Sequence, residues 1–293
     1  MTAFARDKYS ILWDDHALSL GNRTLIMGVL NVTPDSFSDG GRFFGKEQAV
    51  EQALSMAGEG ADIIDIGGES TRPYSEEVSC DEELRRIIPV IEALVNEVKI
   101  PISIDTCKAE VARKALDAGA SMVNDISALR FDPEMASVAA GAGVPVILMH
   151  MKGTPGNMQD NPRYDNLMSE ISDFLRDSIE RAEAGGIPRD MIIIDPGIGF
   201  GKTIDHNLEI IKELNMLRSL ERPVLLGTSR KAFIGSILGN EPHMRDTGTM
   251  ASVSAGIMNG AHIVRVHNVK KAVETAKMID AIISAASGDA NVN

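Results

Sequence analysis

Residues 25–41 read LIMGVLNVTPDSFSDGG, an apolar run followed by a long stretch of turn-forming residues. The run LIMGVL (25–30) does not alternate polar with apolar residues, which is typical of a parallel strand covered on both faces. Asn, Pro, Asp, Ser and paired Gly favour turns in NVTPDSFSDGG (31–41). Because connections in compact proteins are usually short, a loop of this length after a buried strand indicates a functional segment.

The same unit of apolar run, polar tip and amphipathic helix recurs along the chain. The other runs are DIIDI (62–66), ISI (102–104), MV (122–123), VPVILM (144–149), MIII (191–194), PVLLG (223–227) and HIVRV (262–266). Helical patterns lie between them, for example at 46–60 and 81–98. Strands that alternate with helices predict an α/β protein with a parallel sheet, and about eight units over about 250 residues favour a closed (β/α)8 TIM barrel.

The ends of the chain and of the helices carry further signals. Residues 8–24 predict a β-hairpin that caps the bottom of the barrel. Three predicted helices end in Gly-Ala, at 60–61, 119–120 and 260–261, as expected for a C-terminal cap glycine followed by a small residue. We see no linker and expect a single domain over residues 1–293, with a frayed tail at 287–293.

Composition excludes several classes of protein. With 44% hydrophobic and 24% charged residues, the 293-residue chain has the composition of a globular protein. A formal net charge of −13 argues against nucleic acid or an anionic membrane as partner. No signal peptide and no apolar run of membrane-spanning length is evident. Two cysteines, Cys80 and Cys107, form no disulfide framework, which fits a cytoplasmic location.

Polar side chains follow almost every apolar run. In order they are Asn31; Glu69, Ser70, Thr71 and Arg72; Asp105; Asn124; Met149 and His150; Asp195; Ser229 and Lys231; and Arg265 and His267. The carboxyl ends of the strands in such a barrel meet at one mouth, where active sites lie. A barrel selected only for stability does not need ionisable groups at these positions, so we predict an active site there.

The chemistry of these groups divides the mouth into two halves. Asp105, Asn124 and Asp195 form an acidic half suited to a flat heterocycle with amidine-like N–H groups. The other half is a cationic rim of Lys231, Arg265, Arg72 and His267, which suits a phosphate or a carboxylate.

Each residue taken alone also has a simpler interpretation. Asp105 could cap a helix, Asp195 could belong to the Pro-Gly turn that follows it, and Lys231 could be a solvated surface residue. We interpret Cys107 as a small buried residue and Met149 as the floor of a pocket. DPGIGFGKT (195–203) resembles a phosphate loop but has a proline where the Walker pattern requires its first glycine, so we interpret it as a backbone-lined wall.

Eight short motifs in order resemble the dihydropteroate synthases, a family of pterin-binding enzymes. They are NVTPDSFSDGG (31–41), DIGGESTRP (65–73), SIDT (103–106), NDIS (124–127), LMHMKG (148–153), DPGIGFGK (195–202), TSRK (228–231) and RVH (265–267). The resemblance spans nearly the whole chain, with no departure at a motif position.

The resemblance implies condensation of p-aminobenzoate with (7,8-dihydropterin-6-yl)methyl diphosphate to give 7,8-dihydropteroate and diphosphate, by an SN1-like route with Mg²⁺ bound at Asn31. The implied catalytic residues are Asp105, Lys231, Arg265 and His267. The implied residues for the pterin diphosphate are Thr71, Asp105, Asn124, Met149, Asp195, Gly199, Phe200, Lys231, Arg265 and His267. Those for p-aminobenzoate and the loops near it are Thr33, Pro34, Asp35, Ser36, Phe37, Thr71, Arg72, Pro73 and Ser229. The family also implies a homodimer, for which the amphipathic pattern at 268–286 could supply an interface.

Two other functions remain open at this point. A corrinoid-linked methyltetrahydrofolate methyltransferase resembles this family in its barrel and pterin-pocket acids, but it needs no diphosphate site. A non-catalytic pterin-binding barrel would keep Asp105, Asn124 and Asp195 without needing the 31–41 loop or the cationic rim. Because this chain has both features, the synthase is favoured.

Overall fold

The computed structural model describes residues 6–33, 42–70 and 78–285. Within them, parallel strands form one sheet whose order is β8 (Ile192–Asp195), β7 (Val146–Met149), β6 (Met122–Asp125), β5 (Ile102–Asp105), β4 (Ile63–Gly67), β3 (Leu25–Asn31), β10 (Ile263–Val266) and β9 (Leu225–Leu226). A parallel bridge between Ile194 and Val224 joins the two ends of this series. The predicted (β/α)8 barrel is therefore confirmed.

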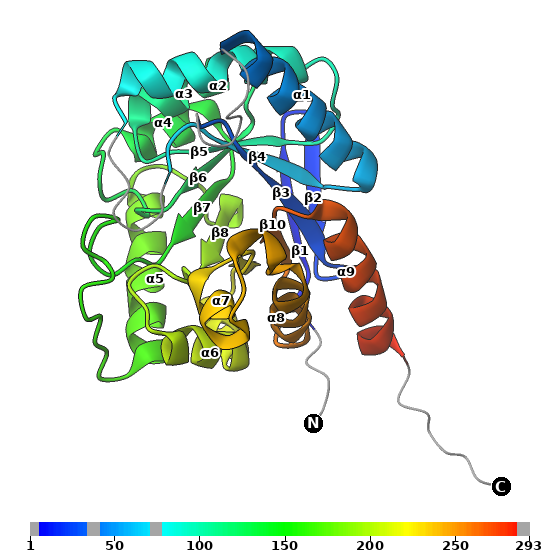
Figure 1. The fold of residues 1–293 in the computed structure, drawn as a ribbon. Coiled ribbons are helices and arrows are strands. Elements are labelled where there is room, and N and C mark those ends of the chain that lie inside the picture. The colour runs from blue at the N-terminus through cyan, green and yellow to red at the C-terminus, as the bar shows by residue number, and fades with distance from the viewer. Residues whose placement is uncertain (1–5, 34–41, 71–77, 286–293) are drawn as a thin grey trace, which may run out of the picture.

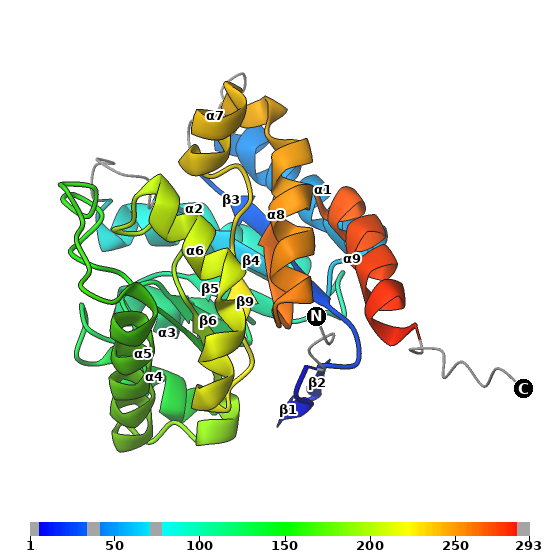
Figure 2. The ribbon, with the colours of Figure 1, turned by 90° about the horizontal axis from the view of Figure 1, so that it is seen from below.

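Helices surround the strands (Figures 1 and 2). They are α1 (Arg42–Glu59), α2 (Cys80–Leu94), α3 (Ala109–Asp117), α4 (Met135–Ala142), α5 (Leu167–Ala184), α6 (Ile204–Lys212), α7 (Ala232–Leu238), α8 (Asp246–Met258) and α9 (Val269–Ser284), with short 3₁₀ turns η2 (Arg189–Met191), η3 (Leu214–Leu220) and η4 (Pro242–Met244). The helix predicted at 81–98 ends at Leu94, where Glu97 N–H turns back to the Leu94 carbonyl at 2.9 Å. The predicted tail at 287–293 lies outside the described residues.

The barrel strands are buried along nearly their whole length, as the continuous apolar runs predicted. All five residues of β4 and all four of β6, β7 and β8 are inaccessible to solvent or nearly so. The three predicted cap glycines, Gly60, Gly119 and Gly260, have φ of +101°, +111° and +106°. These left-handed values suit glycine and let each helix turn directly into the next strand.

The predicted hairpin lies at the amino end of the barrel. Its strands β1 (Tyr9–Trp13) and β2 (His16–Leu20) pair antiparallel, and every second residue faces the core. β1 packs near η2, which immediately precedes β8. The Nε2 of His262, just before β10, donates to the Asp7 carbonyl at 3.1 Å. The hairpin therefore covers the end of the barrel opposite the strand tips.

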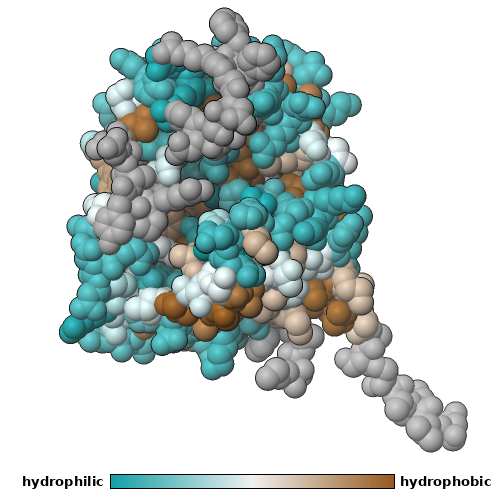
Figure 3. Space-filling view, in the orientation of Figure 1, coloured by the Kyte–Doolittle hydropathy of each residue, from teal (hydrophilic) through white to brown (hydrophobic). Residues whose placement is uncertain are grey.

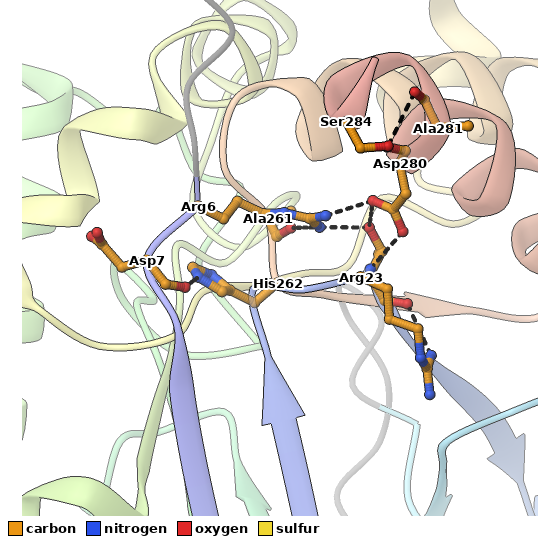
Figure 4. Close-up of polar contacts among 9 residues, drawn as sticks. Arg6, Asp7, Arg23, Ala261, His262, Asp280, Ala281 and Ser284 are labelled. Atoms are coloured by element: carbon orange, nitrogen blue, oxygen red, sulfur yellow. Dashed lines mark hydrogen bonds and ion pairs between the residues drawn. The ribbon is translucent and has the colours of Figure 1, made fainter. Parts of the chain in front are cut away.

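One carboxylate at this amino end ties three distant parts of the chain together (Figure 4). Asp280 on α9 accepts hydrogen bonds from the Thr24 backbone N–H at 2.7 Å and the Thr24 hydroxyl at 2.9 Å. It also pairs with the Arg6 guanidinium at 2.5 Å, and the Arg6 side chain is only 3% exposed. The start of the described chain, the entry to β3 and the last helix are thus fastened at one point.

Replacing Asp280 with alanine should lower the free energy of unfolding by about 3 kcal/mol, because the buried Arg6 cation loses its partner. Chemical denaturation measures the loss. The matched control is Asp173→Ala, which breaks an exposed ion pair with Arg176 on α5 and should leave stability nearly unchanged. Equal losses in the two variants would contradict a special role for Asp280.

Candidate active site

The strand tips bring the predicted acidic residues to one end of the barrel. Asp105 and Asp195 are the last residues of β5 and β8, and Asn124 lies in β6 beside Asp105. Met149 ends β7 next to Asp195. Asp105 does not cap a helix, since the residue that caps α3 is Lys108 and the Ala109 N–H donates to Asp132. The simpler interpretation of Asp105 is therefore wrong.

Arg265 on β10 lies between two carboxylates. Its Nε donates to Asp65 at 2.6 Å and its Nη2 donates to Asp105 at 2.6 Å. Asp65 also accepts from the Asn124 amide at 3.0 Å. Sequence analysis did not single out Asp65, although a charged residue inside the apolar run DIIDI was the available signal. Arg265 is thus part of the acidic half of the site and not only of its rim.

Burial shifts the proton equilibria of these groups toward neutral pH. It raises the pKa of Asp105 to about 7, with Arg265 opposing the shift and Asp65 adding to it. Burial also raises the pKa of Asp195, against the hydrogen bond from the Gly197 N–H. The pKa of Lys231 falls to about 8 because of burial and the nearby Arg265 charge. Perturbed groups that converge on one mouth are typical of a catalytic site.

The segment after β8 forms a wall beside these charges. The Lys231 ammonium lies 4.1 Å from the centroid of the Phe200 ring, a cation–π contact. A Cβ placed on Gly199 would lie 3.2 Å from the Lys231 side chain, so the backbone approaches the lysine closely here. Phe200 and Met149 belong to a small apolar cluster separate from the main core. The mouth therefore offers an apolar surface for a flat ring beside carboxylates and a cation.

The buried Lys202 supports this wall from behind. Its side chain donates to the Phe200 carbonyl at 2.9 Å and lies 2.9 Å from the His150 Nδ1. Burial lowers the pKa of Lys202 to about 7 and that of His150 to about 2. Lys202 is only 3% exposed, which agrees with the interpretation of 195–203 as a wall and not a phosphate loop. The contact between Lys202 and His150 could not be predicted from the sequence.

The basic half of the mouth is partly described. Ser229 and His267 are hydrogen-bonded, with 2.9 Å between the hydroxyl and Nδ1, and the His267 N–H also donates to the hydroxyl. Asn31 ends β3, and its amide makes no hydrogen bond to another described residue; Thr33 follows close behind it. The remaining predicted residues lie outside the described ranges: Pro34, Asp35, Ser36, Phe37, Thr71, Arg72 and Pro73.

The described residues include no group of three or more His, Cys, Asp or Glu side chains arranged to hold a metal ion. None of the helices in the described part of the chain has the length and apolarity needed to cross a membrane.

Two glycines with similar backbones test how tightly the wall is packed. Gly197 has φ of +71°, and a Cβ there would lie 1.9 Å from the His150 carbonyl oxygen. Gly143, which caps α4, has φ of +66° with no described atom within 4 Å of its Cβ position. Gly143→Ala should cost about 1 kcal/mol of stability from its backbone alone. Gly197→Ala should cost about 1–3 kcal/mol more in chemical denaturation, and equal costs would contradict close packing.

Comparisons with known proteins agree with this geometry. Residues 27–267 match the family model of pterin binding enzymes. The dihydropteroate synthase of Synechocystis is 50% identical over 263 residues, covering 89% of this chain and 91% of that protein. Coverage of both chains is thus nearly complete.

Solved structures give the same result. The Yersinia pestis dihydropteroate synthase with a bound sulfonamide drug has a TM-score of 0.87 and 46% identity, over 92% of this chain and 98% of that one. The Xanthomonas albilineans dihydropteroate synthase in complex with 7,8-dihydropteroate has a TM-score of 0.82 and 43% identity, over 90% and 95%. The chain belongs to the family of pterin binding enzymes, among the dihydropteroate synthases.

Proposed function

We propose that the chain condenses p-aminobenzoate with (7,8-dihydropterin-6-yl)methyl diphosphate, giving 7,8-dihydropteroate and diphosphate. The observation that carries the proposal is the convergence of Asp105, Asn124, Asp195 and Lys231 at one mouth, beside the apolar wall of Phe200. The Xanthomonas albilineans enzyme, which is 43% identical to this chain, forms a complex with 7,8-dihydropteroate, the product of this condensation. Free Cys80 and Cys107 fit a cytoplasmic setting for this reaction.

The acidic half recognises the pterin ring. A pterin carries a guanidine-like edge of N–H donors, which Asp195 and the Asn124 carbonyl oxygen accept. Phe200, Gly199 and Met149 form the apolar surface against which the flat ring packs. Lys231 lies over this surface and donates to acceptor atoms of the ring.

The reaction proceeds by an SN1-like route. The bond between the pterin methylene carbon and the diphosphate oxygen breaks, and its electron pair leaves with the diphosphate. The lone pair of the arylamine then attacks the methylene cation, and the nitrogen gives up a proton to solvent water. Ionised Asp105 and Asp195 stabilise the cation, and Lys231, Arg265 and His267 neutralise the leaving group.

Asn31 fits a magnesium ion. Its amide oxygen is a hard ligand at the strand tip with no hydrogen bond to other described residues, and Mg²⁺ often takes few protein ligands besides substrate phosphates. When bound, the ion withdraws electron density from the diphosphate.

We further propose that Ser229, Thr33, Pro34, Asp35, Ser36, Phe37, Thr71, Arg72 and Pro73 lie near the aminobenzoate, with Thr71 also near the pterin diphosphate.

The purified chain should release diphosphate from the pterin diphosphate in the presence of p-aminobenzoate, and a chain that releases none is not this enzyme.

Asp105→Asn should lower kcat by about 100-fold, because the cation loses a nearby negative charge. Its dissociation constant for p-aminobenzoate should change far less. Steady-state kinetics and calorimetry measure the two effects. Asp177→Asn on the exposed face of α5 is the control, and equal kcat for Asp105→Asn and wild type would refute the role of Asp105.

We propose that the functional form is a homodimer joined through α6, α7 and α8. Figure 3 shows apolar side chains gathered over these helices. A groove of about 460 Å³ runs between them, lined by Leu208, Ile211, Phe233, Ile237, Ala251 and Ala255 among others. Burying such a contiguous apolar surface favours association of two copies. The α9 helix, which the sequence suggested, exposes fewer large apolar residues, among them Met278 and Ile282.

Ile237 on α7 is 53% exposed and should anchor this contact. Ile237→Asp should halve the molar mass measured by light scattering, because a charge in an apolar interface is strongly disfavoured. Leu12→Asp changes a residue that is 64% exposed on the outer side of the hairpin and should leave the mass unchanged. A monomeric wild-type protein, or a dimeric Ile237→Asp variant, argues against this interface.

A further inference from the structure

Asp65 is a wholly buried carboxylate in the middle of an apolar strand. Its relative exposure is 0%, and Ile63, Ile64 and Ile66 surround it along β4. Burying a carboxylate costs several kcal/mol unless it is well paired, so an apolar residue would serve the core better. The position therefore calls for an explanation beyond packing.

Both hydrogen bonds between the Asp65 side chain and described residues end on the same carboxylate oxygen. Oδ2 accepts from the Arg265 Nε at 2.6 Å and from the Asn124 Nδ2 at 3.0 Å. The other oxygen, Oδ1, is buried and has no partner among the described residues. A single atom of β4 thus holds a cation from β10 and an amide from β6.

The contact fixes which end of the Asn124 amide faces the mouth. A carboxylate accepts hydrogen bonds only, so the NH₂ end of the amide must point at Asp65. The Asn124 side-chain oxygen, Oδ1, is left without a hydrogen bond to any other described residue. The Asn124 side chain consequently keeps its amide oxygen free to accept a hydrogen bond from a ring that enters the site.

The same contact fixes the plane of the Arg265 guanidinium. Nε is taken by Asp65 and Nη2 by Asp105, at 2.6 Å each. Because the guanidinium is rigid and planar, two bonds set its orientation completely. The remaining nitrogen, Nη1, makes no hydrogen bond to a described residue and is available to an anion at the mouth.

We infer that Asp65 is a positioning residue, whose single oxygen sets the Asn124 amide as an acceptor for the N–H edge of the pterin and aims Arg265 at the leaving group. It acts through these two side chains and does not touch substrate. The inference rests on the proposed function, because it assigns Asn124 and Arg265 their ligands. A purely structural residue would not place a negative charge beside Asp105, whereas Asp65 does.

That charge has a measurable consequence. The charged groups facing Asp105 are Arg265 on β10, Asp65 on β4, Glu83 on α2 and Lys231 at the start of α7. Burial raises the pKa of Asp105 to about 7, and Asp65 adds to the shift. Since the reaction needs ionised Asp105, activity should fall as pH drops through this value. Removing the Asp65 charge lowers the Asp105 pKa and moves the acid limb of the profile to lower pH.

Two variants separate the effect of the Asp65 charge from the effect of its hydrogen bonds to Asn124 and Arg265. Asp65→Asn keeps the shape and an acceptor oxygen for both partners, and places its NH₂ where the unpartnered oxygen lies. Asp65→Ala removes the anchor as well. The matched control is Asp62→Asn, which also breaks an aspartate–arginine pair on the approach to β4, with Arg23, at the opposite end of the barrel.

Asp65→Asn should reduce kcat/KM for the pterin diphosphate about 10-fold and shift the acid limb about one pH unit lower. Asp65→Ala should reduce kcat/KM about 100-fold and weaken binding of 7,8-dihydropteroate in calorimetry, with p-aminobenzoate affinity little changed. Asp62→Asn should leave the acid limb in place.

The inference is overturned if the wild type is active and Asp65→Asn keeps both the acid limb and the pterin affinity of the wild type. If Asp65→Ala does not fold, the near-isosteric Asp65→Asn still decides it. An inactive wild type instead rejects the proposed function, so the two failures are distinct.

Discussion

A guanidinium held between two carboxylates inside the barrel is the interaction on which the rest of the site depends. Arg265 could not remain buried without Asp65 and Asp105, which hold its pKa above the ordinary value although burial alone would lower it. The two carboxylates could not lie together without Arg265. Asn124 takes its orientation from the same cluster. Strands β4, β5, β6 and β10 thus meet in one network of charged and polar side chains.

The barrel could be predicted from the sequence because its strands are buried on both faces and read as continuous apolar runs. The candidate site followed, since parallel strands bring their carboxyl ends together and residues such as Asp105 and Asp195 stand there. Asp65 could not be found in this way, because it lies inside a run and only the register shows which way its side chain points. Lys202 was missed for a related reason. A Gly-Lys pair near a helix resembles a ligand site, and only the fold shows its ammonium turned inward against His150.

The two ends of the barrel are stabilised by different kinds of contact. At the amino end, Asp280 holds Arg6 and Thr24 through hydrogen bonds to both of its carboxylate oxygens. At the carboxyl end, Asp65 Oδ1 and Asp105 Oδ1 are buried without partners among the described residues. Unsatisfied polar atoms cost stability, so the well-paired end offsets what the reactive end gives up.

The barrel closes between β8 and β9, and the few hydrogen bonds at this seam affect how easily the barrel opens locally. β9 is two residues long, and its link to β8 rests on the bridge between Ile194 and Val224. Asp195 and the Phe200 wall follow β8 on one side of the seam, and Ser229 and Lys231 follow β9 on the other side. Where a ladder has few bonds, local opening costs least free energy. Local opening of the barrel should therefore cost least at this seam, beside the side chains that we propose bind the pterin.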